Sequence, residues 1–179
     1  EPSKGLQTPS KPDRPYNITY ILPLYLNNIN DEDYQQKCLP KTALEFYMGS
    51  KIALEEIADL FHTSFDIHVY DSKNSSQVLK SEILPKLNKN KPDLIIGPFM
   101  PENVEGFCSY SLTNKIPFVS PLVYTDSCLI TNPYFISIKP SEEIYIDYLI
   151  GLIRQQFPHY NITLISDAEE EIKLYTSKL

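Results

Sequence analysis

Short apolar segments rich in β-branched residues alternate with longer segments of helical periodicity along most of this chain. Strands that alternate with helices form parallel sheets, because each helix returns the chain to the same edge of the sheet. Right-handed crossovers restrict the layout further. The sequence therefore predicts an α/β fold, a doubly wound parallel sheet with helices on both faces. Strands are expected at 17–24, 65–70, 93–96, 117–120, 134–138 and 161–166, and helices at 41–61, 76–88, 102–114, 142–157 and 168–179.

Individual residues add detail to two of these predicted helices and to the amino-terminal segment. Pro85 lies inside the segment 76–88 and should kink or shorten it, because proline removes a backbone donor. Ser141 precedes the segment 142–157 and should cap it. Residues 1–15 are rich in Pro, Ser and Lys and show no apolar period. That composition is typical of a flexible tether.

The charge balance disfavours two classes of partner. The chain has 16 Lys and Arg against 23 Asp and Glu, a formal net charge of −7, and it contains no basic run. Nucleic-acid binding and docking on an anionic membrane both need clustered positive charge. No apolar run approaches the roughly 20 residues of a membrane helix. We therefore expect no nucleic-acid partner and no transmembrane segment.

Three common motifs of nucleotide binding and nucleophilic catalysis are missing from the sequence. Among its 5 Gly residues there is no GxGxxG turn, no GxxxxGK[ST] loop and no GxSxG elbow. The 3 His residues are scattered, and none accompanies a nucleophile. We predict a protein that is not an enzyme and holds no cofactor or metal.

The 3 Cys residues, Cys38, Cys108 and Cys128, lie too far apart for a metal knuckle or a CxxC redox motif. One disulfide with one free thiol and three separate thiols both fit the sequence. We favour three separate thiols.

Five loop motifs follow one another in a characteristic order and spacing: VYDS at 69–72, PDLIIGP at 92–98, IPFVSP at 116–121, PYF at 133–135 and PS at 140–141. Together they resemble the type I periplasmic binding proteins, and more narrowly the branched-chain amino acid (Leu/Ile/Val) receptor-like group of ABC importers. The resemblance extends from about Tyr16 to Leu179.

The resemblance implies two doubly wound lobes that close on a small ligand, in a chain about twice as long. Residues 16–140 would form the first lobe. Residues 141–179 would form a crossover helix and the first strand and helix of an incomplete second lobe. The resemblance also implies a place in the periplasm or cell envelope, where residues 1–15 would connect to a lipid anchor or an upstream module.

Ligands of such sheets bind beyond the carboxyl ends of the strands. The resemblance implies a hydroxyl group after the third strand and a Thr after the fourth, which hold an amino acid. Pro101 stands at about the first position, so the usual grip on the carboxylate is altered there. Tyr124 stands at about the second position, and a shift of one residue would place Thr125 there instead. Two interpretations are open for four residues of these loops, Phe99, Met100, Tyr124 and Thr125. They form a wall that contacts a ligand, or they pack against a partner or simply fill the loop. Asp71 and Ser120 are further candidates, either as ligand contacts or as loop caps.

Three functions remain open at this point. The first is a non-catalytic receptor for a small, amino-acid-like molecule. The second is a receptor-derived interaction or regulatory module, linked to cell-wall binding or synthesis, with an envelope protein as its partner. The third is a doubly wound enzyme whose catalytic residues lie elsewhere.

Overall fold

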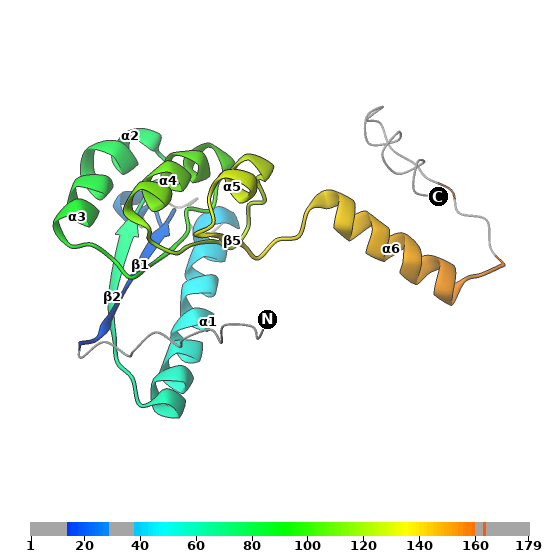
Figure 1. The fold of residues 1–179 in the computed structure, drawn as a ribbon, viewed down its shortest axis with the longest axis horizontal. Coiled ribbons are helices and arrows are strands. Elements are labelled where there is room, and N and C mark those ends of the chain that lie inside the picture. Colours follow the sequence, from blue (N-terminus) through cyan, green and yellow to red (C-terminus); the bar gives the residue numbers. More distant parts are fainter. Residues whose placement is uncertain (1–13, 29–37, 160–162, 164–179) are drawn as a thin grey trace, which may run out of the picture.

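A computed structural model describes residues 14–28, 38–159 and 163 (Figure 1). Five strands form one sheet in the order β2-β1-β3-β4-β5, and every neighbouring pair is parallel. The predicted doubly wound parallel sheet is confirmed. The strands are β1 Tyr16–Leu22, β2 Phe65–Asp71, β3 Leu94–Ile96, β4 Phe118–Ser120 and β5 Phe135–Ser137.

The helices follow the predicted order with two differences. The segment expected at 76–88 consists of α2, a π-helical turn and α3, and Pro85 lies in the first turn of α3, where no backbone donor is required. Helix α5 occupies part of a segment expected to be a loop. The helices are α1 Cys38–Phe61, α2 Ser76–Val78, α3 Leu84–Lys89, α4 Pro101–Asn114, α5 Asp126–Thr131 and α6 Glu142–Gln156; the π turn is Leu79–Ile83, and a short 3₁₀ turn is Leu26–Asn28.

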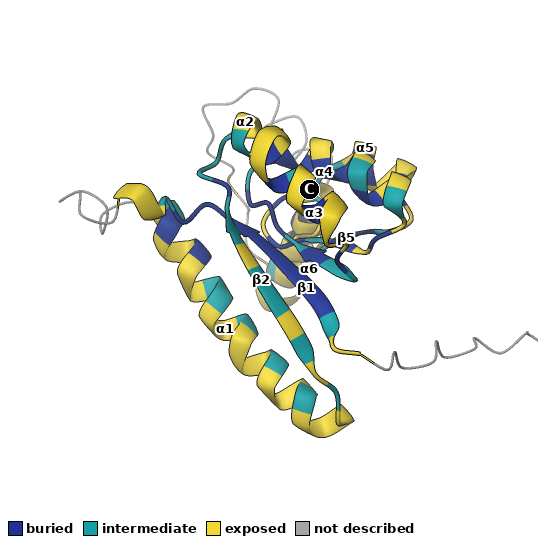
Figure 2. Ribbon diagram, turned by 90° about the vertical axis from the view of Figure 1, so that its left-hand side faces the viewer, coloured by how far each residue is buried: buried dark blue, intermediate teal, exposed yellow. Residues whose placement is uncertain are grey.

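The two faces of the sheet are covered unequally. Helices α2 to α5 lie on one side and α1 on the other (Figure 2). The first face buries Ile21, Ile95 and Phe118 against Phe107 of α4 and its neighbours. The second face buries Ile18 and its neighbours against α1. Single-helix coverage leaves apolar residues of this second face, such as Leu94, partly exposed.

The spacing of α1 places Phe46, Ser50, Ala53, Leu54, Ile57, Ala58 and Phe61 on one side, but this side is buried only in part. Ala43 is fully buried near the start of α1, and Phe46 packs against the second core cluster. Toward the other end, Ile57 is 40% exposed and Phe61 is 64% exposed. The last turns of α1 therefore face a space that no described side chain fills.

The preference for three separate thiols is wrong. Cys108 of α4 and Cys128 of α5 form a disulfide, whereas Cys38 is exposed and free. The sequence separation of 20 residues did not suggest this pairing. It arises because α4 and α5 cover the same face of the sheet and bring the two Cα atoms to 5.9 Å, within the range that a disulfide spans.

Helix α6 leaves the body of the sheet after β5 (Figure 1). Its predicted cap is present, since the backbone N–H of Ile144 donates to Ser141 Oγ at 3.2 Å. The expected strand 161–166, apart from residue 163, and the expected helix 168–179 lie outside the described residues, as does the expected tether up to residue 13.

Candidate ligand-binding rim

The carboxyl ends of the parallel strands meet at one edge of the sheet, which we call the rim. The register pairs Leu22 with Asp71, the last residues of β1 and β2. Ser120 pairs with Ser137, the last residues of β4 and β5. The predicted loops after β1, β2, β3 and β4 therefore gather at the same edge, where doubly wound sheets bind ligands.

The Asp71 carboxylate caps the loop that follows β1. It accepts hydrogen bonds from the backbone N–H groups of Leu24 at 3.0 Å, Tyr25 at 3.0 Å and Leu26 at 2.8 Å. It also accepts one from the N–H of Lys73 at 3.0 Å. Both carboxylate oxygens are thus used, and the loops after β1 and β2 are tied together. This geometry matches the loop-capping interpretation of Asp71.

The loop after β3 passes close to β1. Gly97 has φ 90°, which favours glycine, and a Cβ at this position would lie 2.2 Å from the backbone oxygen of Ile21. The Gly97–Pro98 peptide bond is cis. Only a residue without a side chain allows this approach, which brings Phe99 and Met100 to the start of α4.

Phe99 does not line the rim surface. It is 3% exposed, and its ring meets that of Phe46 of α1 edge to face, with centroids 5.3 Å apart. Met100 is half-buried and occupies the N-cap position of α4. Of the two, only Met100 has surface available at the rim.

Tyr124 and Thr125 are the accessible polar residues of the loop between β4 and α5. The Tyr124 hydroxyl donates to Oδ1 of Asp126 at 2.6 Å. This hydrogen bond raises the pKa of Tyr124 above its ordinary value, so the hydroxyl keeps its proton. Thr125 Oγ1 lies 2.9 Å from Ser127 Oγ. Both side chains present hydroxyl groups at the rim, and Asp126 adds a negative charge.

Ser120 lies at the end of β4 but is fully buried. Its Oγ has no hydrogen-bond partner among the described residues. A molecule bound on the surface of the rim does not reach this hydroxyl in the present arrangement.

Asn132, the buried C-cap residue of α5, was not predicted from the sequence. Its Nδ2 donates to the backbone oxygen of Cys108 at 3.0 Å and to Ser111 Oγ at 3.2 Å. Its Oδ1 accepts from the N–H of Tyr134 at 2.9 Å. Together with the disulfide, these bonds anchor α5, whose N-terminal side holds Tyr124 and Thr125. The Asn-Pro pair at 132–133 was the available signal, because it marks a turn.

The described part of the chain lacks two further features. No group of His, Cys, Asp or Glu side chains there is arranged to hold a metal ion. None of the helices described combines the length and apolar character needed to span a bilayer.

The sequence matches no protein-family model and no curated protein. Solved structures do share its fold. The leucine-binding protein LivK of Thermotoga maritima aligns with TM-score 0.61 and 13% identity over 91% of this chain. LivJ of Streptococcus pneumoniae, a branched-chain amino acid transporter substrate-binding protein solved with isoleucine, aligns with TM-score 0.59 and 12% identity over 80%. Full-length LpoA of Haemophilus influenzae aligns with TM-score 0.59 and 10% identity over 92%.

The fold is that of a type I periplasmic binding protein lobe. The chain spans 45% of LivK, 39% of LivJ and 27% of LpoA, so it is less than half as long as each of these proteins. The expected resemblance is thus confirmed at the level of fold.

Proposed function

We propose that the protein is a non-catalytic receptor domain that binds a small, amino-acid-like molecule at the rim. The fold supports this proposal, because two proteins of the same fold bear the names of leucine-binding and branched-chain amino acid-binding proteins. The observation that contributes most is the loop between β4 and α5, which presents the hydroxyl groups of Tyr124 and Thr125 at the rim.

The rim also suggests how the ligand is held. Pro101 opens α4 and offers no N–H, and Glu102 occupies the first turn of α4. Both features oppose a carboxylate at this helix terminus. We therefore assign the ligand contacts to Tyr124, Thr125 and Met100, and the ligand's ammonium group to the neighbourhood of Asp126. Asp71 and Phe99 hold the surrounding loops in place.

We also propose an envelope location. Disulfides persist in oxidising compartments such as the bacterial periplasm and the cell surface. The Cys108–Cys128 bridge supports such a compartment. Residues 1–15 would then connect the domain to a lipid anchor or an upstream module.

A thermal-shift screen of amino acids and their derivatives tests the receptor proposal on the full-length protein. A ligand that binds only the folded state stabilises it by RT ln(1 + [L]/Kd), so the melting temperature rises with ligand concentration. Tyr124→Ala should weaken the binding of that ligand by about tenfold, through lost contact and an unpaired polar group. Tyr148→Ala is the matched control, because Tyr148 lies on α6 and is 72% exposed. If Tyr124→Ala and Tyr148→Ala bind the ligand with equal affinity, Tyr124 does not contact the ligand.

The second candidate is a protein-interaction module of the cell envelope. The observation that favours it is an apolar stripe on α6, where Ile144, Tyr145 and Tyr148 are all more than half exposed. Exposed patches of this kind mark interaction surfaces. If no small molecule shifts the melting temperature, and Tyr148→Glu abolishes cross-linking to an envelope protein that the wild type captures, this second function replaces the first.

A further inference from the structure

The edge of the sheet opposite the rim contains an apolar pocket of about 540 Å³. This volume lies within the range of roughly 300–1,000 Å³ that is usual for ligand sites. The pocket forms where the last turns of α1 stand off the amino ends of β1, β2 and β3. Its apolar lining consists of Tyr16, Ile18, Ile57, Phe61, Phe65 and Leu94.

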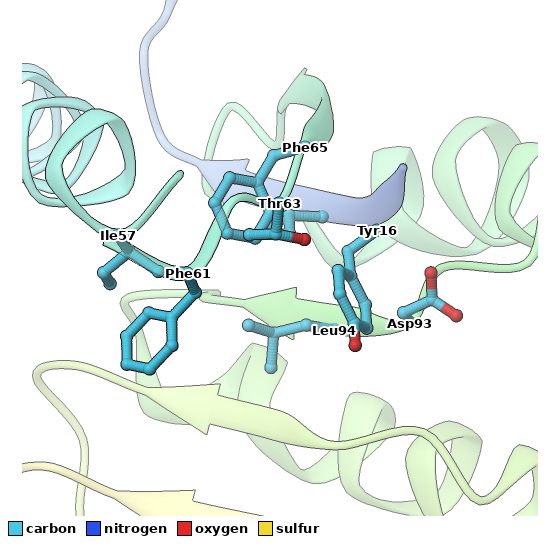
Figure 3. A pocket seen from close by; sticks show the side chains of 8 residues that line it. Tyr16, Ile57, Phe61, Thr63, Phe65, Asp93 and Leu94 are labelled. Atoms are coloured by element: carbon cyan, nitrogen blue, oxygen red, sulfur yellow. The ribbon is translucent and has the colours of Figure 1, made fainter. Parts of the chain in front are cut away.

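The pocket has an apolar end and a polar end. Figure 3 shows Ile57 and Phe61 of α1 on one side and the Asp93 carboxylate on the other, with Tyr16 beside Asp93. Ile18 also lines the pocket and is 3% exposed. The exposed surface of Ile57 and Phe61 would be removed from water by an apolar occupant, which gives binding a hydrophobic driving force.

A basic hollow of about 350 Å³ lies next to the polar end, and Asp93 lines both spaces. Arg14, Lys91 and Lys115 surround this hollow. They precede β1, β3 and β4, three neighbouring strands of the sheet, so their positive charges gather at one edge. In a chain of net charge −7 this grouping is a local exception.

The charge of Asp93 is already balanced. Arg14 donates from its two terminal nitrogens to the two Asp93 oxygens, at 2.6 and 2.7 Å. The N–H of Asn17 donates to Oδ2 of Asp93 at 2.8 Å. Neither Lys91 nor Lys115 takes part in an ion pair with any residue the structure describes. The hollow therefore keeps the positive charge of two lysines.

We propose that the apolar pocket and the basic hollow together form a second binding site, for a free single-chain amphiphile with an anionic head. The apolar chain fills the space between α1 and the sheet, and the carboxylate or phosphate head lies at Lys91 and Lys115. The site is separate from the rim, because it lies at the amino ends of the strands. Charge complementarity selects an anionic head over a neutral or cationic one.

Isothermal titration of the full-length protein tests this proposal, with probes kept below their micelle-forming concentrations. Dodecanoate and dodecyl phosphate should bind saturably, and dodecyltrimethylammonium should bind at least about tenfold more weakly. The double variant Lys91→Glu/Lys115→Glu should lower dodecanoate affinity by about tenfold or more. Lys51→Glu, an exposed change on α1 outside the site, should leave that affinity unchanged.

A second pair of variants tests the apolar end. Phe61→Ser should weaken dodecanoate binding by about tenfold, because the chain loses an apolar wall. Leu60→Ser is the control, since Leu60 is the next residue of α1 and is 72% exposed but does not line the pocket. Thermal melting of each variant shows that it is folded.

Four results would overturn the proposal. The first is no saturable binding of either anionic probe. The second is equal affinity for anionic and cationic probes. The third is that the lysine substitutions change the melting temperature but leave the dodecanoate affinity unchanged. In that case the lysines would only stabilise helix C-termini. Recruitment to phosphatidylglycerol vesicles without binding of the free amphiphile also counts against the proposal.

Discussion

Gly97 lies so close to Ile21 that a Cβ at position 97 would come within 2.2 Å of the Ile21 backbone oxygen. This approach joins the loop after β3 to the neighbouring strand β1. Backbone atoms cannot yield as a flexible side chain can, and the φ of 90° is itself unfavourable for other residues. The start of α4 at the rim therefore depends on glycine at this position.

Gly97→Ala should destabilise the protein by about 1–3 kcal/mol or more, from strain at this position and the clash with Ile21. Urea denaturation measures the change in the free energy of unfolding. Gly106→Ala in α4 is the matched control, because a Cβ there meets no atom within 4 Å. That substitution should be neutral or stabilising by up to about 1 kcal/mol, since alanine favours helix. Similar losses in both variants would refute the argument.

Asn132→Ala should destabilise the fold by about 1–3 kcal/mol, because the N–H of Tyr134 and the buried oxygens that accept from Asn132 lose their partner. Urea denaturation again measures the change. Asn114→Ala, which removes one partly buried hydrogen bond to the Tyr110 oxygen, should cost less. A larger loss at Asn114 than at Asn132 would contradict the role of this buried network.

Cys108→Ser combined with Cys128→Ser should lower the free energy of unfolding by about 2–4 kcal/mol, because the unfolded chain gains conformational freedom. The same double variant should lower the affinity of any rim ligand, since α5 loses one of its anchors. Cys38→Ser is the control and should change neither property, because Cys38 is exposed and unpaired. Thiol titration of the native protein should find one reactive thiol per chain; three would disprove the bridge.

The pH dependence of stability should report on the pair of Arg14 and Asp93. The hydrogen bonds from Arg14 hold the pKa of Asp93 below its ordinary value. A depressed folded-state pKa contributes stability above the unfolded pKa, near 3.9 for Asp, and this contribution is lost as the pH falls through the folded pKa. Arg14→Ala should therefore be less stable than the wild type at pH 7, and the difference should shrink at strongly acidic pH.

Acid denaturation curves of both proteins, together with an NMR titration of the Asp93 carboxyl, provide the measurement. Lys41→Ala is the control, because Lys41 forms only a long, exposed ion pair with Glu45 at 3.9 Å. An Asp93 pKa that stays unchanged in Arg14→Ala would show that Arg14 does not cause the shift.

Local patterns were sufficient for most of the fold. The strand segments are β-branched and bounded by turn residues, so their order is readable without knowledge of distant contacts. Ser141 acts on the first turn that follows it, and Pro85 acts on its own helix, so both effects were predictable from neighbouring residues. Helix α5 was missed because six residues with one buried side chain show no helical period.

The candidate site was harder to read, because burial depends on residues far away in the chain. Phe99 was a candidate for a wall that contacts the ligand, but its ring packs against Phe46 of α1. Asp71 was expected either to contact a ligand or to cap a loop. In the structure its carboxylate oxygens accept hydrogen bonds from the N–H groups of the loop after β1, which matches the cap. Neither contact can be recognised from the residues that neighbour Phe99 or Asp71 in the sequence.

The sequence by itself determined the alternation of strands and helices, the parallel sheet and the edge where its loops gather. Those properties follow from periodicity and chain connectivity, which are local. Only the tertiary structure decided the Cys108–Cys128 pairing, the burial of Phe99 and the gap between α1 and the sheet. These depend on how the helices lie on the sheet, because contacts between distant segments arise only once the elements pack together.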